Sequence, residues 1–333
     1  MILHGHAGPT AAFLDARASG RMHHAWLLTG PQGVGKGSFA RAAALRLLAD
    51  AAGPRVDLPG IETPPDHGIV KLWEAGSHPD IMLLDRLYRE KTKDFARSIT
   101  VDQVRGLSRL FATSPSFSPV RIVIVDAADD MERSGANALL KLLEEPPADA
   151  IFLLVSHAPA RLLPTIRSRC RVLRFDPLGQ ADMVAALSQA MPDIGPQEIE
   201  TLAAIGDGAP GKAIRYAGLD VAGLDRAIES IVRSGDADNA ERAALARSLA
   251  LKAAQPRYEA FLERLPTRIA AEARHRAGQP LADAVQAWEK ARALAGSAVR
   301  LSLDPQTTVF ELAGLLASLH QTTGQIMDFS ARR

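Results

Sequence analysis

The chain has 333 residues, a length typical of two or three domains rather than one. Hydrophobic residues make up 47% and charged residues 23%, the composition of an ordinary globular protein. The formal net charge of +1 excludes a strong overall attraction to nucleic acid or membrane, so any nucleic-acid contact must be local or shared with partners. A single cysteine, Cys170, excludes a disulfide framework and a four-cysteine zinc site. With no signal-like or membrane-spanning run in the sequence, we expect a cytoplasmic protein with no membrane partner.

Short apolar runs alternate with helical patterns in the first half of the chain. The runs are continuous rather than alternating, which is typical of parallel strands covered on both faces. They are His24–Thr29, Asp80–Asp85, Arg121–Asp126, Ile151–Ser156 and Arg171–Phe175. Thr100 and Gln103 form a capping-box pattern at the start of one intervening helix, and another must end at Pro146. The pattern predicts a doubly wound α/β domain over residues 1–176.

Two stretches of this domain lack a strand or helix pattern. The Pro- and Gly-rich segment 53–79 is expected to be a surface excursion. The run "RLYREKTKD", Arg86–Asp94, is expected to be a solvated loop, with a nucleic-acid contact as the less favoured alternative.

The strand signal ends after Pro177. Three short helical patterns follow and predict a small all-α unit over residues 177–220. Longer helices rich in Ala, Leu and Arg follow, such as "TVFELAGLLASLHQTTGQIMDF", and predict a separate helical domain over residues 221–333.

The stretch "GPQGVGKGS", Gly30 to Ser38, is close to the phosphate-binding pattern G-x-x-x-x-G-K-[ST]. It follows a strand and opens a helix, which is the context such a loop requires. Gly30, Gly33 and Gly35 allow the backbone to form a nest of N–H groups, and Lys36 would bridge the β- and γ-phosphates.

Two parts of an ATP-hydrolysing site are missing from this sequence. The hydroxyl that normally ligates Mg²⁺ is replaced by Gly37, and Ser38 lies about 100° further round the helix. Asp126 is well placed as the aspartate that ends the second metal-binding strand, but Ala127 follows it where many ATPases have a water-activating glutamate. Losing a general base typically costs roughly 10²–10⁴ in rate.

The stretch "LLPTIRSRC", Leu162 to Cys170, places Arg167 and Arg169 on either side of Ser168. An arginine at a domain edge can stabilise charge on a neighbouring subunit's ATP, although on position alone a surface salt bridge is the more common role. Cys170 adjoins a strand and is expected to be a small buried hydrophobe.

Several segments together resemble the delta-prime family of bacterial DNA polymerase III clamp-loader subunits. They are "HHAWLLTGPQGVGKGSFARAAALRLL", "SHPDIMLLDR", "ITVDQVRGL", "VIVDAADDMERSGANALLKLLEEPP" and "LLPTIRSRCRVLRF". The resemblance covers about residues 20–215, and the C-terminal part only by layout. It implies an AAA+ domain, a helical lid and a collar that joins five subunits into a ring.

The resemblance also implies roles for particular residues. Gly30, Gly33, Gly35 and Lys36 match the phosphate-binding loop, Asp126 matches the Walker-B aspartate and Ser156 matches a sensor-1 position. Arg169 matches the arginine of the "SRC" motif that acts on a neighbouring subunit. Gly211, beside Lys212, stands where active members carry a sensor-2 arginine.

The sequence departs from many clamp-loader subunits in the segment after the first long helix. Many of them carry a four-cysteine zinc module there, whereas His67 and His78 of this segment have no cysteine companions. We therefore expect no zinc, no required cofactor, and at most weak binding of ATP or ADP in a degenerate site formed by the loop residues with Ser38, Asp126 and Ser156.

Taken with the resemblance, the residues favour a subunit that hydrolyses no ATP and donates Arg169 to a neighbour's site. The implied partners are the gamma/tau and delta subunits, the sliding clamp and, through the complex, primer–template DNA. An active gamma/tau-type ATPase is the alternative, and Gly37, Ala127 and Gly211 oppose it. A P-loop kinase would need an acceptor site and a lid arginine that the sequence does not offer.

Overall fold

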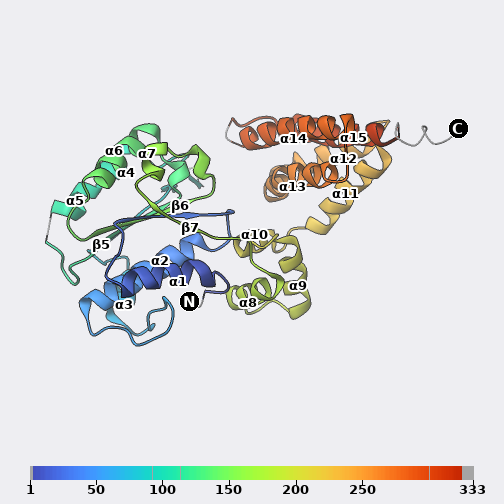
Figure 1. The fold of residues 1–333 in the computed structure, drawn as a ribbon. Coiled ribbons are helices and arrows are strands. Elements are labelled where there is room, and N and C mark those ends of the chain that lie inside the picture. Colours follow the sequence, from blue (N-terminus) through green and yellow to red (C-terminus); the bar gives the residue numbers. More distant parts are fainter. Residues whose placement is uncertain (1–2, 92, 113, 300, 325–333) are drawn as a thin grey trace. The chain divides into compact units, whose positions relative to one another are not determined.

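The computed structural model describes residues 3–91, 93–112, 114–299 and 301–324, with side chains described as far as residue 320. The chain divides into two compact units, Met1–Arg215 and Tyr216–Arg333 (Figure 1). The tail of the last expected helix, residues 325–329, and the expected end of the collar at residue 333 lie outside the described residues.

The first unit is built on a five-stranded parallel sheet in the described part of the chain, with strand order β2-β5-β6-β1-β7. Its strands are β1 (Ala25–Thr29), β2 (Ile81–Leu84), β5 (Arg121–Asp126), β6 (Ala150–Ser156) and β7 (Arg171–Arg174). All five expected strands therefore exist within a residue or two of the predicted bounds. The apolar runs are continuous because both faces of the sheet are covered by helices.

Side chains of β1 alternate between two hydrophobic cores. Trp26 and Leu28 pack on one side of the sheet with Phe13 and Phe39, whereas Leu27 packs on the other side with Phe152. The first core is covered by α1 (Ala7–Ala18), α2 (Lys36–Ala52) and α3 (Gly68–Glu74). The second is covered by α4 (Val101–Arg105), α5 (Leu107–Ala112), α6 (Arg133–Glu144) and α7 (Pro164–Arg167), as Figure 1 shows. The predicted α/β fold with helices on both faces is confirmed.

The capping box predicted at Thr100 and Gln103 is present, with both the side-chain and the backbone bond formed. The helix that it starts is shorter than expected, because α4 ends at Arg105 with Gly106 as its C-cap, and α5 begins at Leu107. The 3₁₀ turns of this unit are η1 (Ala128–Asp130) and η2 (Pro159–Arg161).

The segment Arg86–Asp94, expected to be a loop, contains a small antiparallel hairpin of β3 (Tyr88–Arg89) and β4 (Asp94–Phe95). The described residues of the segment are exposed, as expected of a solvated stretch, but the hairpin was missed because two-residue strands among charged residues leave no periodic signal.

The unit ends in α8 (Gln180–Ala190), α9 (Pro196–Ile205) and α10 (Pro210–Tyr216), the last of which reaches the first residue of the second unit. These helices match the three helical patterns after Pro177. Their treatment as a separate lid over residues 177–220 stays a prediction, because residues as far as 215 belong to the first compact unit.

The second unit is helical throughout its described part. Its elements are α11 (Val221–Ser234), α12 (Ala240–Leu249), η3 (Lys252–Ala254), α13 (Gln255–Ala273), α14 (Gln279–Ala298) and α15 (Pro305–Gly324). Leu312 and Leu316 of α15 are fully buried, as are Phe261 and Leu265 of α13, so the unit has a hydrophobic core of its own. In the described parts of the chain we find no helix that is long and apolar enough to cross a bilayer.

Candidate functional site

The phosphate-binding loop joins β1 to α2 in the geometry that its glycines predict. Gly30, Gly33 and Gly35 have φ angles of 149°, 81° and 112°, a region that L side chains rarely adopt. A side chain on Gly30 would also overlap the carbonyl of Phe175, which follows the neighbouring strand β7. The sequence therefore specifies a nest of backbone N–H groups at the start of α2.

Lys36, the lysine of this loop, is turned into its own loop. Its side chain is 2% exposed, and Nζ donates to the carbonyl oxygens of Gly30 at 2.6 Å and Pro31 at 2.5 Å. Burial lowers the pKa of Lys36 to about 8, against the opposing effect of Asp126 and Asp129. Most of the lysine is still protonated at pH 7, so it can hold a phosphate if those two carbonyl contacts are exchanged.

Gly37 faces the carboxylate of Asp126 at the carboxyl end of β5. A Cβ built on Gly37 would lie 2.5 Å from Oδ2 of Asp126, closer than real Cβ contacts. Burial raises the pKa of Asp126, while Arg41 at 3.8 Å and Lys36 oppose the rise. The position that normally supplies a Mg²⁺-binding hydroxyl is thus filled by the Asp126 carboxylate, and Ala127 beside it carries no acid or base.

Hydrogen bonds join the residues that follow β5 to those at the end of β6. Ser156, fully buried, donates from its hydroxyl to Oδ1 of Asp129 at 2.8 Å, and Oδ2 of Asp129 accepts from the backbone N–H of His157. Asp129 therefore caps the loop that follows the neighbouring strand β6. Asp130 forms an ion pair with Arg86 at 3.2 Å.

His157 adjoins this network and is held neutral. Burial lowers the pKa of His157 to about 4, and the charge of Lys36 adds to the effect. Its Nδ1 is buried without a hydrogen-bond partner among the described residues. The position that matches sensor-1 therefore holds a serine bonded to Asp129, followed by a neutral imidazole.

A pocket of about 370 Å³ lies beside the loop on the side of Ser38. It is lined by His6, Gly35, Ser38 and Gln189 among others, and it does not include Asp126. Ser38 thus lines a pocket that Asp126 does not line, which agrees with its place one residue further along the helix than Gly37. A planar base could enter such a pocket, whose wall is largely apolar.

The start of α10 closes directly over the phosphate-binding loop. The N–H of Gly211 donates to the carbonyl of Gly33 at 2.8 Å, and a Cβ on Gly211 would lie 2.9 Å from the Cα of Gly33. An arginine at position 211 would place its Cβ against the backbone of the loop, where there is no room for it. Lys212 forms an ion pair with Asp207 at 2.5 Å.

Arg169 lies two residues beyond the C-terminal end of α7, and its side chain is 35% exposed. One of its guanidinium nitrogens, Nη2, is 2.8 Å from Oε1 of Glu144 at the end of α6, and Nη1 donates to the carbonyl of Thr165 at 3.0 Å. The pair links the "NALLKLLEEPP" and "SRC" stretches in space. Arg167 is exposed on the same short helix, and the guanidinium of Arg171 lies 5.0 Å from the ring centre of Trp26. Burial raises the pKa of Cys170 to about 12, so this thiol is inert at neutral pH.

The segment 53–79 is organised by Arg46, a buried arginine that the sequence did not single out. All five of its N–H donors are used, four on carbonyl oxygens of the segment and one on Asp50. The carbonyls belong to Val56, Leu58, Gly60 and Glu62, at 2.7 to 3.1 Å. In the same region His67 and His78 each accept a backbone N–H through Nδ1.

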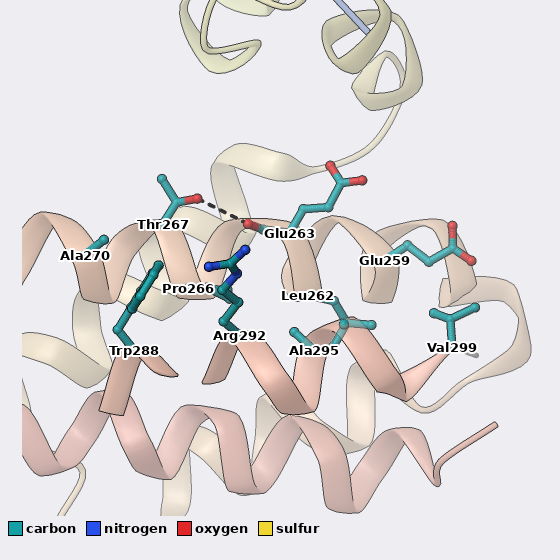
Figure 2. A pocket seen from close by; sticks show the side chains of 11 residues that line it. Glu259, Leu262, Glu263, Pro266, Thr267, Ala270, Trp288, Arg292, Ala295 and Val299 are labelled. Carbon is teal, nitrogen blue, oxygen red and sulfur yellow. Dashed lines mark hydrogen bonds between the residues drawn. The ribbon is translucent and has the colours of Figure 1, made fainter. Parts of the chain in front are cut away.

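A groove of about 630 Å³ lies between α13 and α14 in the second unit (Figure 2). Leu262, Pro266, Trp288 and Val299 give it apolar walls, and the guanidinium of Arg292 lies 5.3 Å from the ring centre of Trp288. Pro266 inside α13 has no N–H, so the carbonyl of Leu262 lacks its usual helical donor. The groove is thus a concave and largely apolar part of the surface of this unit.

Comparison with known proteins places the chain in a family. A family model described as "DNA polymerase III, delta subunit" matches residues 7–179. A DNA polymerase III subunit delta' of Pseudomonas aeruginosa is 39% identical over 202 residues, 60% of this chain and 57% of that protein. A gamma/tau subunit of Mycobacterium bovis is 37% identical over 182 residues, 54% of this chain and 28% of that protein.

Among solved structures, a gamma subunit-related protein of Thermotoga maritima matches 92% of this chain and 99% of its own, at 14% identity and a TM-score of 0.40. The chain spans little more than half the length of the delta' relative and about a quarter of the gamma/tau relative. Because the family model covers more than half of the chain, the chain belongs to the delta-prime family of DNA polymerase III clamp-loader subunits.

Proposed function

We propose that this chain takes part in DNA replication as a clamp-loader subunit that hydrolyses no ATP itself. It helps a complex with gamma/tau and delta subunits to place the sliding clamp on primed DNA, in the cytoplasm. The observation that carries the proposal is the contact between Gly37 and the Asp126 carboxylate, which leaves no space for a metal-binding hydroxyl.

Three further features support the absence of hydrolysis. Ala127 supplies no base, and the loss of a general base typically costs roughly 10²–10⁴ in rate. Lys36 is bonded to carbonyls of its own loop, so binding a phosphate means breaking those contacts first. Gly211 packs on Gly33 where an active member would place an arginine.

Weak binding of ATP or ADP remains part of the proposal. The nest of N–H groups is intact, and the pocket of about 370 Å³ beside Ser38 is open to a base. No cofactor is required for the proposed role, and no zinc is expected, because Arg46 rather than a metal holds the segment 53–79 together.

The positive contribution of the subunit is Arg169, which we propose acts on the ATP of an adjacent gamma/tau subunit. Its fork suits a phosphate group and stays charged at any working pH. Its ion pair with Glu144 joins two partly exposed side chains, 35% and 43%, and such surface pairs contribute little stability. Exchanging Glu144 for a phosphate therefore costs little.

Assembly is assigned to the helical unit from about residue 221 onward. The groove between α13 and α14 supports this, because its apolar walls suit the apolar face of a helix of a neighbouring subunit (Figure 2). Val299 on its wall is 53% exposed, so its side chain is available for contact with a partner.

The proposal is tested by purifying the chain alone and with gamma/tau and delta subunits. Alone it should show no ATP turnover that Lys36→Ala abolishes, and together the three should elute as one complex. Val299→Glu should weaken the complex, whereas Leu251→Glu, at a position 64% exposed but outside the groove, should not. Turnover in the usual enzyme range of about 1–10³ s⁻¹ would refute the proposal.

The alternative function, an active gamma/tau-type ATPase, has one observation in its favour. The chain is 37% identical to a gamma/tau subunit over 182 residues, and its glycine nest and Lys36 are complete. The same ATPase assay separates the two, since a gamma/tau-type enzyme must turn over ATP with its own Lys36.

A further inference from the structure

The hairpin of β3 and β4 exposes two aromatic rings on one face. Tyr88 and Phe95 are direct cross-strand partners, with ring centres 5.3 Å apart and planes 69° to each other. The two residues are 49% and 53% exposed, and the preceding Leu87 is 55% exposed. Folding does not require this arrangement, because rings that remain half in water contribute little burial to the core.

The same hairpin carries a concentration of positive charge. Between Arg86 and Arg97 five basic residues accompany two acidic ones, a local net charge of +3 in a chain whose total is +1. The basic residues are Arg86, Arg89, Lys91, Lys93 and Arg97, and the last four are exposed. Arg86 pairs with Asp130, whereas the ion pairs found among the described residues include none for Arg89, Lys91 or Arg97.

The charge is placed around the ring pair rather than apart from it. Arg97 follows Phe95 by two residues and so continues its face, Lys91 and Lys93 stand at the turn, and Arg89, paired with Asp94, belongs to the opposite face. A ligand that meets the rings therefore also meets Arg97 beside Phe95 and the two lysines at the turn. A polyanion whose units carry flat apolar faces satisfies both features at once.

We propose that the hairpin is a binding site for single-stranded nucleic acid. Tyr88 and Phe95 take an unpaired base on their exposed surfaces, and Lys91, Lys93 and Arg97 contact the adjoining phosphates. Stacking accepts any base because every base has a π face, so the site tracks a strand without reading its sequence. Base pairs of a duplex hide those faces, so single strands are preferred.

A protein partner would fit this surface less well. Burying the ring pair against protein would also bury or closely approach several cations, which an apolar partner could not compensate. The inference deepens the proposed function, since it places a nucleic-acid contact on this chain itself. It rests on that function only for the biological source of the strand.

The test is fluorescence anisotropy of a labelled oligo(dT) of about 20 nucleotides, titrated with the isolated full-length chain at about 50 mM salt. The expected result is binding that weakens about tenfold when salt rises to about 200 mM, because phosphate contacts release counterions. A duplex of the same length should bind several-fold more weakly.

Two variants separate stacking from charge. Tyr88→Leu/Phe95→Leu keeps apolar bulk on the hairpin but removes both π faces, and it should weaken binding about tenfold with an unchanged salt dependence. Lys91→Glu/Arg97→Glu should weaken binding further and flatten the salt dependence. Lys252→Glu/Lys290→Glu makes the same change of total charge on exposed residues of the second unit and should bind as wild type does.

Several results would overturn the inference. One is the absence of wild-type binding at the highest usable concentration. Others are equal affinity of the wild type and the leucine variant, or an equal loss in the Lys252/Lys290 control. Retained oligo(dT) binding with lost complex assembly in the hairpin variants would instead make the hairpin a protein-docking surface. Because binding is measured on the isolated chain, its failure leaves the ATPase and assembly tests of the proposed function untouched.

Discussion

The Cα of Gly37 points at the carboxylate of Asp126, so that a Cβ at this position would lie 2.5 Å from Oδ2. The missing hydroxyl and the position of the aspartate are therefore one structural feature. The guanidinium of Arg41 lies 3.8 Å from the same oxygen and offsets its negative charge, as a metal ion would in an active site. Restoring the loop motif alone should not restore an ATPase.

Gly37→Ser tests this relationship. The serine must displace the Asp126 carboxylate, and overpacking of this kind typically costs about 1–3 kcal/mol. We expect a lower free energy of unfolding in urea and no gain of ATP turnover, because Ala127 still supplies no base. Gly8→Ser, at a helical glycine with nothing within 4 Å of its would-be Cβ, is the matched control. Mg²⁺-dependent turnover in Gly37→Ser, or unchanged stability, would show that the Asp126 carboxylate does not exclude a side chain at position 37.

Lys36 should make stability depend on pH in the alkaline range. Its pKa of about 8 in the folded chain lies below its ordinary value of 10.5, so the unfolded chain holds the proton more strongly. Between these two pH values unfolding takes up a proton, so the free energy of unfolding rises with pH across that window. Below it, the buried charge of Lys36 destabilises the folded chain most.

Lys36→Met should therefore raise the free energy of unfolding at pH 7 by about 1–3 kcal/mol. The advantage over wild type should shrink as the pH rises from about 8 toward 10.5. Subtracting the free energy of unfolding of wild type from that of Lys36→Met at each pH cancels the effect of other groups that titrate there, such as Cys170. Lys71→Met, an exposed lysine of α3, is the control. An advantage that is constant with pH would mean that Lys36 is not destabilised by burial.

Removing the side chain of Arg46 should lower the free energy of unfolding more than removing that of any other arginine in its region. Arg46→Ala leaves four carbonyls of the segment 53–79 without their donor, and losing one partner of a buried charged network typically costs about 3–5 kcal/mol. Arg46→Lys should rescue little, since an ammonium has three donors where the guanidinium uses five.

The measurement for Arg46 is thermal unfolding together with limited proteolysis of the segment. Cleavage within residues 53–79 should appear in Arg46→Ala before the rest of the chain unfolds. Arg55→Ala, which alters an exposed arginine of the same segment, should leave both readouts unchanged. Equal behaviour of the two variants would mean that the segment is held by other contacts.

Much of the first unit could be predicted from the sequence because its signals are local. Continuous apolar runs identify strands covered on both faces, and β5, Arg121–Asp126, has the predicted bounds. The glycine spacing likewise specified the conformation of the loop, and the capping box gave the start of α4. Each of these depends on a few neighbouring residues.

The features that sequence reasoning missed are those that join distant segments. Arg46 lies in a helix of small and apolar residues, and only the fold brings it to carbonyls ten to sixteen residues away. The Arg169–Glu144 pair joins two motifs that the sequence treats separately. The hairpin was missed because charged side chains dominate its two-residue strands, and the pairing of Tyr88 with Phe95 is not visible in composition.

The central claim is that this subunit acts through Arg169 on a neighbour rather than through its own loop. Its most direct test is clamp- and DNA-stimulated ATP hydrolysis by a complex reconstituted with gamma/tau and delta subunits and carrying Arg169→Ala. Arginine fingers contribute about 10³–10⁵ in rate in GTPases, so hydrolysis at the one bordered site should collapse while assembly is intact. Arg167→Ala should behave as wild type. Wild-type hydrolysis in Arg169→Ala, or the same defect in both variants, would contradict the account.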